Sequence, residues 1–226
     1  MKDLPVFTTE HGVASLILRE IPYQGTSYVI LRDSLEPEAL ARECADFCRA
    51  CGAEEIYASG HTALEAYPFH TAMWEMVCRR EGIPDTDAAL WPVQEHTLGR
   101  WLEIYNGKVR KVPNGAWMAR ADGQTMLEKG DGYFIHRGET LLGIGRASCD
   151  RIDWVAAVLP GAGADVVKAL AHAVTEDTIS LTVASVNQKA VELYERLGFL
   201  RTREISRWYR LGCALDRIHK TGERNL

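Results

Sequence analysis

The sequence lacks the features by which membrane and secreted proteins are recognised. No apolar run in its 226 residues approaches the roughly 20 that a membrane-spanning helix needs. The segment Met1–Glu10 has no apolar signal-peptide core. A hydrophobic content of 46% and a charged content of 25% are ordinary for a soluble globular protein. We therefore expect a cytoplasmic protein with no membrane association.

Positive charge is also scarce. The chain has 26 Lys and Arg against 31 Asp and Glu, a formal net charge of −5. A protein that binds nucleic acid through its phosphates shows a basic excess instead, so no nucleic acid is expected as a partner. The seven histidines show no close metal-ligand spacing, and no nucleophile-elbow, P-loop or dinucleotide-binding motif occurs. No metal is therefore expected.

Six cysteines in a chain of this kind are better interpreted as reduced thiols than as a disulfide framework. Cys44, Cys48 and Cys51 have the C-x3-C-x2-C spacing of the iron–sulfur motif of radical-SAM enzymes, in which thiolates hold iron. They also fall on one face of a helix that begins at Pro37 and ends at Gly52. We favour the interpretation that these thiols pack as small hydrophobes, with the cluster as the alternative.

The most informative segment is a strand, Leu181–Ser185, followed by a short amphipathic helix. Ala190, Leu193, Tyr194 and Leu197 recur at spacings of three and four and share a helical face. A glycine, Gly198, then closes the last turn. Helix formation explains this pattern but not an Asn near the helix start or a Tyr on its apolar face.

This strand and the helix after it resemble the closing motif of the GNAT superfamily of acyl-CoA-dependent N-acetyltransferases. The matching pattern is Asn187-x-x-Ala-x-x-x-Tyr194-x-x-x-Gly198-Phe199. The resemblance implies that Asn187 contacts coenzyme A and that Tyr194 protonates the departing thiolate. The ordinary pKa of a tyrosine, about 10, is close to that of an alkyl thiol, so this transfer would be nearly isoenergetic. The alternative is a core tyrosine on an ordinary helix.

The segments from Trp91 onward also follow the GNAT order. We predict a helix over Glu95–Tyr105 closed by Asn106-Gly107, a helix or loop to Lys129, three strands, a helix, a strand, the Asn187/Tyr194 helix and a last strand. The predicted strands are Gly132–His136, Thr140–Ala147, Ile152–Leu159, Thr178–Ser185 and Leu200–Leu211, with a helix over Asp165–Val174. The fold class is therefore α+β, with a GNAT-type mixed central sheet flanked by helices in a domain over residues 91–226.

Residues 1–90 are expected to form a smaller α/β subdomain. Val13–Ile21 and Ser27–Arg32 indicate a hairpin, followed by the cysteine helix, a strand and a helical stretch near Thr62–Arg80. An offset of 126 residues, from Ser27 to Asp153, superposes the strands and helices of the two parts. One interpretation is therefore a degenerate GNAT-like half. At the positions of Asn187 and Tyr194 it has His61 and Pro68, and proline cannot donate a proton.

The GNAT resemblance assigns the pyrophosphate of acetyl-CoA, the co-substrate, to the segment Gly161-Ala162-Gly163-Ala164. This segment lies between a strand and a helix, where free backbone N–H groups favour an anion. The loop is shortened and lacks the family's Arg or Gln before the first glycine. Asp165 adds a negative charge in the first turn. The same resemblance places the amide near Val158 opposite the thioester oxygen.

Asp153, on the central strand, is our candidate for the general base, although it is displaced by one residue from the position of the family's usual glutamate. Such a shift reverses the face of a side chain unless a bulge corrects it. Glu139, His136 and Glu103 are alternatives. An aromatic wall of Tyr105, Trp117 and Tyr133 is one guess for the acceptor side.

The resulting expectation is transfer of an acetyl group from acetyl-CoA to a primary amine of a small molecule or protein by direct attack in a ternary complex. The alternatives are a catalytically inactive GNAT-like protein that binds an acyl-CoA, a partner-binding module, and the iron–sulfur enzyme. The sequence leaves the amine acceptor and the oligomeric state open, a homodimer included.

Overall fold

The computed structural model describes residues 5–212, which form two compact units. Unit 1 contains residues 5–71 and 206–212, and unit 2 contains residues 72–205. Two strands, β5 (Phe69–Arg79) and β11 (Leu200–Arg210), have residues in both units. The sequence predicted two domains that meet near residue 90. The compact units are divided at other positions, and the predicted domain organisation stays a prediction.

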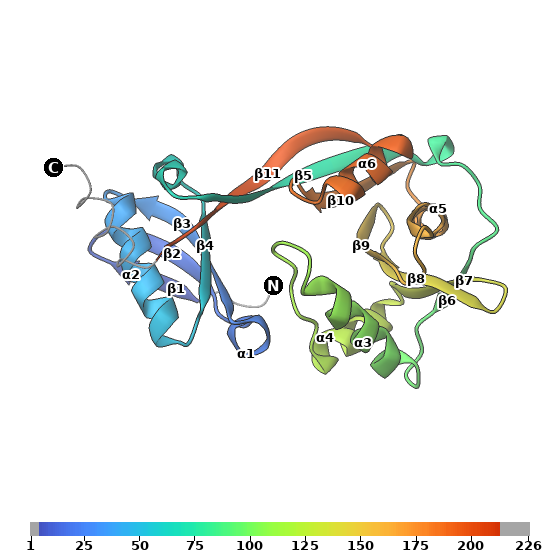
Figure 1. Ribbon diagram of the computed structural model, residues 1–226, viewed down its shortest axis with the longest axis horizontal. Helices are drawn as coiled ribbons and strands as arrows, with labels where there is room; N and C mark the ends of the chain where they lie inside the picture. The colour runs from blue at the N-terminus through green and yellow to red at the C-terminus, as the bar shows by residue number, and fades with distance from the viewer. Residues whose placement is uncertain (1–4, 213–226) are drawn as a thin grey trace, which may run out of the picture. The chain divides into compact units, whose positions relative to one another are not determined.

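Unit 1 is a sheet covered on one face by a helix (Figure 1). Its elements are β1 (Val6–Thr9), β2 (Gly12–Ile17), α1 (Ile21–Gln24), β3 (Thr26–Ser34), α2 (Pro37–Ala50), β4 (Glu55–Ser59) and a 3₁₀ turn, η1 (Thr62–Ala66). The strand order is β1-β2-β3-β4-β11, in which β3 and β4 are parallel. The predicted hairpin is present as the antiparallel pair β2–β3.

Unit 2 holds the remaining elements. They are β5, a 3₁₀ turn η2 (Arg80–Gly82), β6 (Ala89–Pro92), α3 (Leu98–Val109), α4 (Arg120–Lys129), β7 (Gly132–Arg137), β8 (Thr140–Ala147), β9 (Arg151–Ala157), α5 (Gly163–Ala173), β10 (Thr178–Ala184), α6 (Gln188–Arg196) and β11. The strand order is β5-β10-β9-β8-β7-β6, with only β9 and β10 parallel among neighbours. The predicted order of three strands, helix, strand, helix and strand is confirmed.

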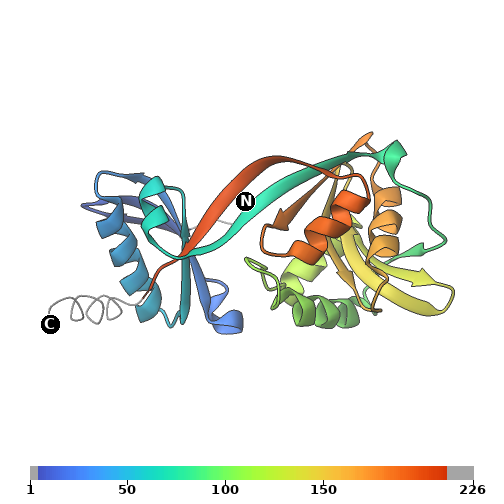
Figure 2. The same cartoon turned by 45° about the horizontal axis from the view of Figure 1, so that its top comes forward.

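Unit 2 has three layers, with its sheet between two pairs of helices. Helices α5 and α6 pack on one face around a core that includes Val166, Leu170 and Phe199. Helices α3 and α4 pack on the other around Trp101 and Met126. Figure 2 shows the two pairs on opposite sides of the strands. In the part of the chain that the structure describes, no helix combines the length and apolar character that crossing a bilayer requires.

Two glycines allow α5 to lie unusually close to β8. A Cβ at Gly143 would stand 2.6 Å from Cγ2 of Val166, and one at Gly145 would stand 2.3 Å from Cδ1 of Leu170. Real Cβ atoms do not approach other atoms so closely. These glycines therefore serve helix packing, which positions the start of α5 at the end of β9.

The two halves of the sequence repeat one order of elements. Strand, helix, parallel strand appears as β3-α2-β4 in the first half and as β9-α5-β10 in the second. Helices α2 and α5 begin at Pro37 and Gly163, which are separated by the offset of 126 residues found in the sequence. Each half then ends in an 11-residue strand, β5 or β11.

These last strands are exchanged between the halves. Strand β5, from the first half, pairs with β10 over seven residues, Met73–Arg79. Strand β11, from the second half, pairs with β4 at Tyr209 and Arg210. Each compact unit therefore contains a strand supplied by the other half of the sequence.

Two of the predicted elements are wrong. The segment predicted as helical near Thr62–Arg80 is a 3₁₀ turn followed by β5, because pairing with β10 overrides the local pattern. The helix predicted to close at Asn106-Gly107 continues to Val109. Its Asn106 is buried and exchanges two hydrogen bonds with the backbone of Met118, at 2.9 and 3.0 Å, so it fastens the helix instead of ending it.

Candidate active site

The central feature of the site is a gap between two parallel strands. Strands β9 and β10 pair only at Arg151↔Ser180 and Ile152↔Leu181. Beyond these two pairs the strands part, and their remaining residues up to Ala157 and Ala184 have no partner across the gap. In unit 1 the corresponding strands, β3 and β4, stay paired over five residues, Thr26–Ile30. Of the two repeats, β3-α2-β4 and β9-α5-β10, the second therefore has a gap between its parallel strands and the first does not.

The open stretch of β9 presents free backbone amides to the gap. The Val158 N–H, which the sequence placed opposite a thioester, donates instead to the carbonyl of Leu142 at 2.8 Å. Amides of an antiparallel strand point alternately to either side, so the N–H of Ala157, which lies opposite Gly143, points away from β8. By the same alternation the N–H of Val155, which lies opposite Gly145, also points away from β8, so the amides of Val155 and Ala157 both face the gap.

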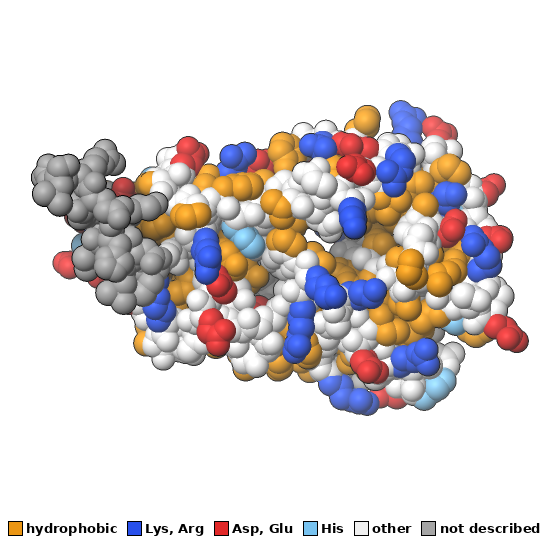
Figure 3. Space-filling model, in the orientation of Figure 1, with side chains coloured by type: hydrophobic (Ala, Val, Ile, Leu, Met, Phe, Trp, Pro, Cys, Tyr) orange, Lys and Arg blue, Asp and Glu red, His pale blue; other side chains and the backbone are white. Residues whose placement is uncertain are grey.

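Apolar side chains surround the wide end of the gap. Val158, Leu159 and Val186 follow the ends of β9 and β10, and they are 36%, 43% and 46% exposed. Exposed apolar groups gathered at one place indicate a surface that binds something apolar. Over the face drawn in Figure 3, basic and acidic side chains both occur among apolar ones.

The turn from β9 into α5 is shaped as an anion cradle. Gly161 has a φ of 84°, and a Cβ there would meet nothing within 4 Å. Ala162, the residue before α5, provides no side-chain cap. The first helical hydrogen bond is donated by the N–H of Val166, which leaves the amides of Gly163, Ala164 and Asp165 for an external acceptor. Of the predicted residues, Gly163 and Ala164 therefore have free amides, whereas the Ala162 N–H donates to the carbonyl of Leu159 at 3.2 Å.

Asp165 does not leave an uncompensated charge in this cradle. Its carboxylate lies 3.0 Å from the Arg137 guanidinium and 3.9 Å from the Lys168 ammonium. These two cations offset the negative charge that the sequence placed beside a phosphate. The equivalent turn in unit 1 has no glycine and carries Glu36 and Glu38 at the start of α2, so a cradle is absent from the described first copy.

Asn187 and Tyr194 lie on α6 with different surroundings. The Asn187 side chain caps the helix by accepting a hydrogen bond from the Ala190 N–H at 3.4 Å. Tyr194 is 9% exposed and packs against Phe199 within the α5–α6 core. Burial raises the pKa of Tyr194 to about 12, so its phenol keeps its proton throughout the physiological range.

Asp153 is the extra residue of a β-bulge. Arg146 pairs with Trp154 and Ala147 with Ile152, so Asp153 has no partner on β8. A bulge redirects a side chain, so regular alternation does not fix the face of Asp153, and its role as the base stays a prediction. Its carboxylate lies 3.0 Å from Arg151. Asp153 is also the first residue of β9 beyond the paired stretch.

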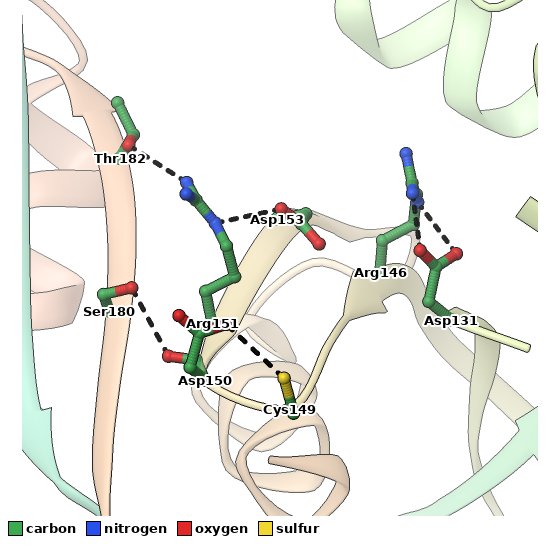
Figure 4. A network of polar contacts seen from close by, with 8 residues as sticks. All are labelled: Asp131, Arg146, Cys149, Asp150, Arg151, Asp153, Ser180 and Thr182. Atoms are coloured by element: carbon green, nitrogen blue, oxygen red, sulfur yellow. Dashed lines mark hydrogen bonds and ion pairs between the residues drawn. The ribbon is translucent and has the colours of Figure 1, made fainter. Parts of the chain in front are cut away.

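Arg151 bridges the narrow end of the gap, as Figure 4 shows. Besides its ion pair with Asp153, its guanidinium donates to the hydroxyl of Thr182 on β10 at 3.4 Å. Figure 4 also shows a second pair close by, between Arg146 and Asp131. Neither arginine is among the site residues predicted from the sequence. The only available signal was a cation inside or beside an otherwise apolar strand.

The other candidate residues from the sequence lie elsewhere. Glu139 and Glu103 are exposed, the first beside a hairpin turn and the second on α3, and His136 stacks on Trp91 at 4.9 Å. Tyr105 is buried against Trp154 at 4.3 Å. Trp117 packs under the Arg110 guanidinium, and Tyr133 lines a cavity with Asp153.

The iron–sulfur alternative finds no support in the described residues. Cys44 and Cys48 are completely buried in the unit 1 core, whereas Cys51 is exposed. Burial raises the pKa of the Cys44 thiol to about 12, which disfavours the thiolate that a metal requires. Among residues 5–212 no group of three metal-ligating side chains comes together.

Comparison with known proteins adds independent observations. Residues 160–209 match the family described as FR47-like protein, and this segment contains the cradle, α5, β10, α6 and most of β11. No sequence among the curated proteins matches the chain.

Solved structures share the fold over nearly the whole chain. A conserved protein of unknown function from Staphylococcus epidermidis is 12% identical, with a TM-score of 0.59 over 92% of this chain and 93% of its own. A GCN5-related N-acetyltransferase from Sphaerobacter thermophilus is 12% identical, with a TM-score of 0.58 over 88% and 76%. A tandem GNAT protein from the clavulanic acid biosynthesis pathway is 13% identical, with a TM-score of 0.51 over 90% and 80%. The chain therefore has the fold of the GNAT superfamily, and the resemblance predicted from the Asn187/Tyr194 helix is confirmed.

Proposed function

We propose that the protein transfers an acetyl group from acetyl-CoA to a primary amine by direct attack in a ternary complex. The observation that carries this proposal is the parting of β9 and β10 after two pairs. An extended pantetheine chain could occupy the gap and bond to strand amides as an added strand does. Because β3 and β4 stay paired, the proposed site lies in unit 2 alone.

In this proposal the cradle and the gap hold the co-substrate. The free amides of Gly163, Ala164 and Asp165 bind the pyrophosphate at the positive end of α5. Val158, Leu159 and Val186 line the entrance, and the Asn187 side chain contacts coenzyme A from the start of α6. The N–H of Val155 or of Ala157 donates to the thioester oxygen, where such a donor is worth about 2.7–4 kcal/mol in the transition state; Val155 lies nearer to Asp153 along β9.

Two side chains move the protons. The amine attacks the thioester carbon, a C–N bond forms, and the C–S bond breaks. Asp153 accepts the proton lost from the amine, and a positioned base of this kind contributes typically about 10²–10⁴-fold to the rate. Tyr194, which is neutral at physiological pH, gives its phenolic proton to the departing thiolate, although the raised pKa of about 12 makes this transfer uphill. The products are an N-acetylated amine and free coenzyme A.

A second candidate is a catalytically inactive protein that binds an acyl-CoA or a partner. The shortened loop favours it, because no Arg or Gln precedes Gly161. The burial of Tyr194 within the α5–α6 core also suits a purely structural tyrosine. This candidate shares acyl-CoA binding with the first but requires no turnover.

Acetyl-CoA binding is tested first, by calorimetric titration of the wild type and of Gly161→Glu. The new carboxylate would stand in the cradle, and we expect micromolar binding to weaken by at least tenfold. Gly52→Glu is the matched control, because Gly52 has a similar φ of 92° and lies in unit 1. Equal loss in both variants, or no binding by the wild type, would contradict the proposal. Binding without turnover of any amine would leave the inactive candidate.

A further inference from the structure

A cavity of about 490 Å³ adjoins the gap on the side of the β8–β9 turn. Its charged lining residues are two cations, Lys129 and Arg146, and two carboxylates, Asp131 and Asp153. This balance is unsuited to a polycation or a polyanion. It complements a small molecule that carries one charge of each sign.

Arg146 is held in a fixed orientation by a buried partner. Its Nε and Nη2 atoms donate to the two oxygens of Asp131 at 3.2 and 2.6 Å, and the Asp131 side chain is 9% exposed. The third guanidinium nitrogen points away from Asp131, as Figure 4 shows. The pair therefore presents a preorganised donor, which is the geometry that carboxylate recognition uses.

Asp153 supplies the opposite charge in the same cavity. One carboxylate oxygen pairs with Arg151, on the strand side, and the residue also lines the cavity. Its charge lies near Arg146, whose pKa is raised because the bond to Asp131 and the charges of Asp131 and Asp153 outweigh the lowering effect of burial. Tyr133 completes this wall as a neutral phenol, since burial and then the charge of Asp131 raise its pKa.

We propose that the acceptor is a free α-amino acid, whose carboxylate binds Arg146 and whose amino group lies on Asp153, one strand position beyond the paired residues of β9. This inference rests on the proposed function and adds its substrate class. The ammonium group of the amino acid loses one proton to Asp153, and the resulting amine attacks the thioester carbon. As the C–N bond forms, the nitrogen loses a second proton, which replaces the one that Tyr194 gives to the thiolate. The thiolate leaves with the proton of Tyr194, so the products are an N-acetyl amino acid and coenzyme A. A peptide, whose first residue has no free carboxylate, is not an acceptor in this proposal.

The test compares alanine, alaninamide and ethylamine as acceptors for the wild type and for two variants. In the Asp131→Asn/Arg146→Gln double variant both charges are removed together, so that neither side chain is left buried and unpaired. Arg120→Gln is the control, because Arg120 is 71% exposed and pairs with Glu95 at the surface. We expect the double variant to raise the KM for alanine by about 10- to 100-fold, the range of a lost bond to a charged group. The KM for ethylamine should not change.

Binding of alanine to the protein without acetyl-CoA, followed by calorimetry, separates this inference from the proposed function. Binding that the double variant loses and Arg120→Gln keeps would support the inference even if no turnover were found. No binding of alanine, or the same rise of KM for alanine and ethylamine, would overturn it. In that case acetylation of ethylamine would leave the proposed function intact.

Discussion

Tyr194 combines a reactive group with an apolar environment. Its ring packs in the α5–α6 core, and burial raises its pKa to about 12. Such a phenol stays protonated at neutral pH, but it is a weaker acid than an alkyl thiol, so burial makes the proposed transfer to the thiolate less favourable than the nearly isoenergetic one expected from the ordinary pKa of about 10. Its chemistry is therefore restricted to the end of the proposed reaction.

Tyr194→Phe should lower kcat by about one to three orders of magnitude, within the range of general acid catalysis. Acetyl-CoA affinity should be nearly unchanged, since the ring and its packing stay. Steady-state kinetics and calorimetry on the same preparation measure both quantities. An unaltered kcat would remove Tyr194 from the mechanism, and a parallel loss of affinity would mark it as a packing residue.

The same residue should make the protein sensitive to alkali. In the unfolded chain its pKa is about 10, whereas in the folded chain it is raised to about 12. The stability from burying the neutral phenol is therefore complete below pH 10 and is lost as the pH rises through 12. The difference in unfolding free energy between Tyr194→Phe and wild type should shift in favour of the variant over this interval. Urea titrations at pH 9, 10 and 11 check this, and a pH-independent difference would contradict it.

Sequence reasoning found the site residues whose signal is local. Asn187 and Tyr194 could be chosen because they interrupt a helix pattern, and Gly161 because it separates a strand from a helix. Arg146 could not be found in this way, because its partner Asp131 is 15 residues away and meets it only in the register of β7 and β8. Whether the chosen residues act as proposed stays a prediction.

At the scale of elements, β8 and α5 pack against each other without intervening side chains at two glycines. Glycines inside a strand usually weaken it, but here the missing side chains of Gly143 and Gly145 make room for Val166 and Leu170. Helix α5 then directs its free amides to the end of β9. A substitution in β8 that displaces α5 would thus also move the free amides at the start of this helix.

Gly145→Ala should destabilise the protein by about 1–3 kcal/mol, the usual cost of overpacking a core, because its Cβ would stand 2.3 Å from Leu170. The same substitution at Gly107 in α3, where nothing lies within 4 Å of a new Cβ, should stabilise by about 0.5–1 kcal/mol. Urea denaturation of both variants tests the opposite signs. Equal effects would show that the contact in β8 is relieved without cost.

Elements with a strong local pattern were predictable, and those made by distant pairing were not. Helices α2, α5 and α6 and strands β7 to β10 follow from periodicity and turn residues. Strand β5 was predicted as a helix because its partner β10 lies about a hundred residues later in the sequence and leaves no local trace. The short edge strands β1 and β6 were missed for a related reason, since four residues are too few for a pattern.

At the scale of the whole molecule, the strand exchange makes each unit depend on both halves of the sequence. A fragment of residues 91–226 lacks β5, so β10 loses a partner to which it pairs over seven residues. A fragment of residues 69–226 keeps β5 and thus every described residue of unit 2. We expect the longer fragment to fold and the shorter one to aggregate or stay unfolded. Circular dichroism and gel filtration compare them, and two equally folded fragments would contradict this view.

The exchange also governs the order in which the protein can fold during its synthesis. Chains grow at about 5–20 residues per second, so β5 leaves the ribosome several seconds before β10 is made. Unit 1, although nearly complete by then, still lacks Tyr209 and Arg210 of β11, which pair with β4. The strands of unit 2 stay unpaired at one edge until β10 has been made, and β4 stays unpaired until β11 has been made. The nascent chain therefore carries open strand edges for much of its translation. We therefore expect a holdase chaperone to matter more for the yield of this protein than for a chain whose halves close independently.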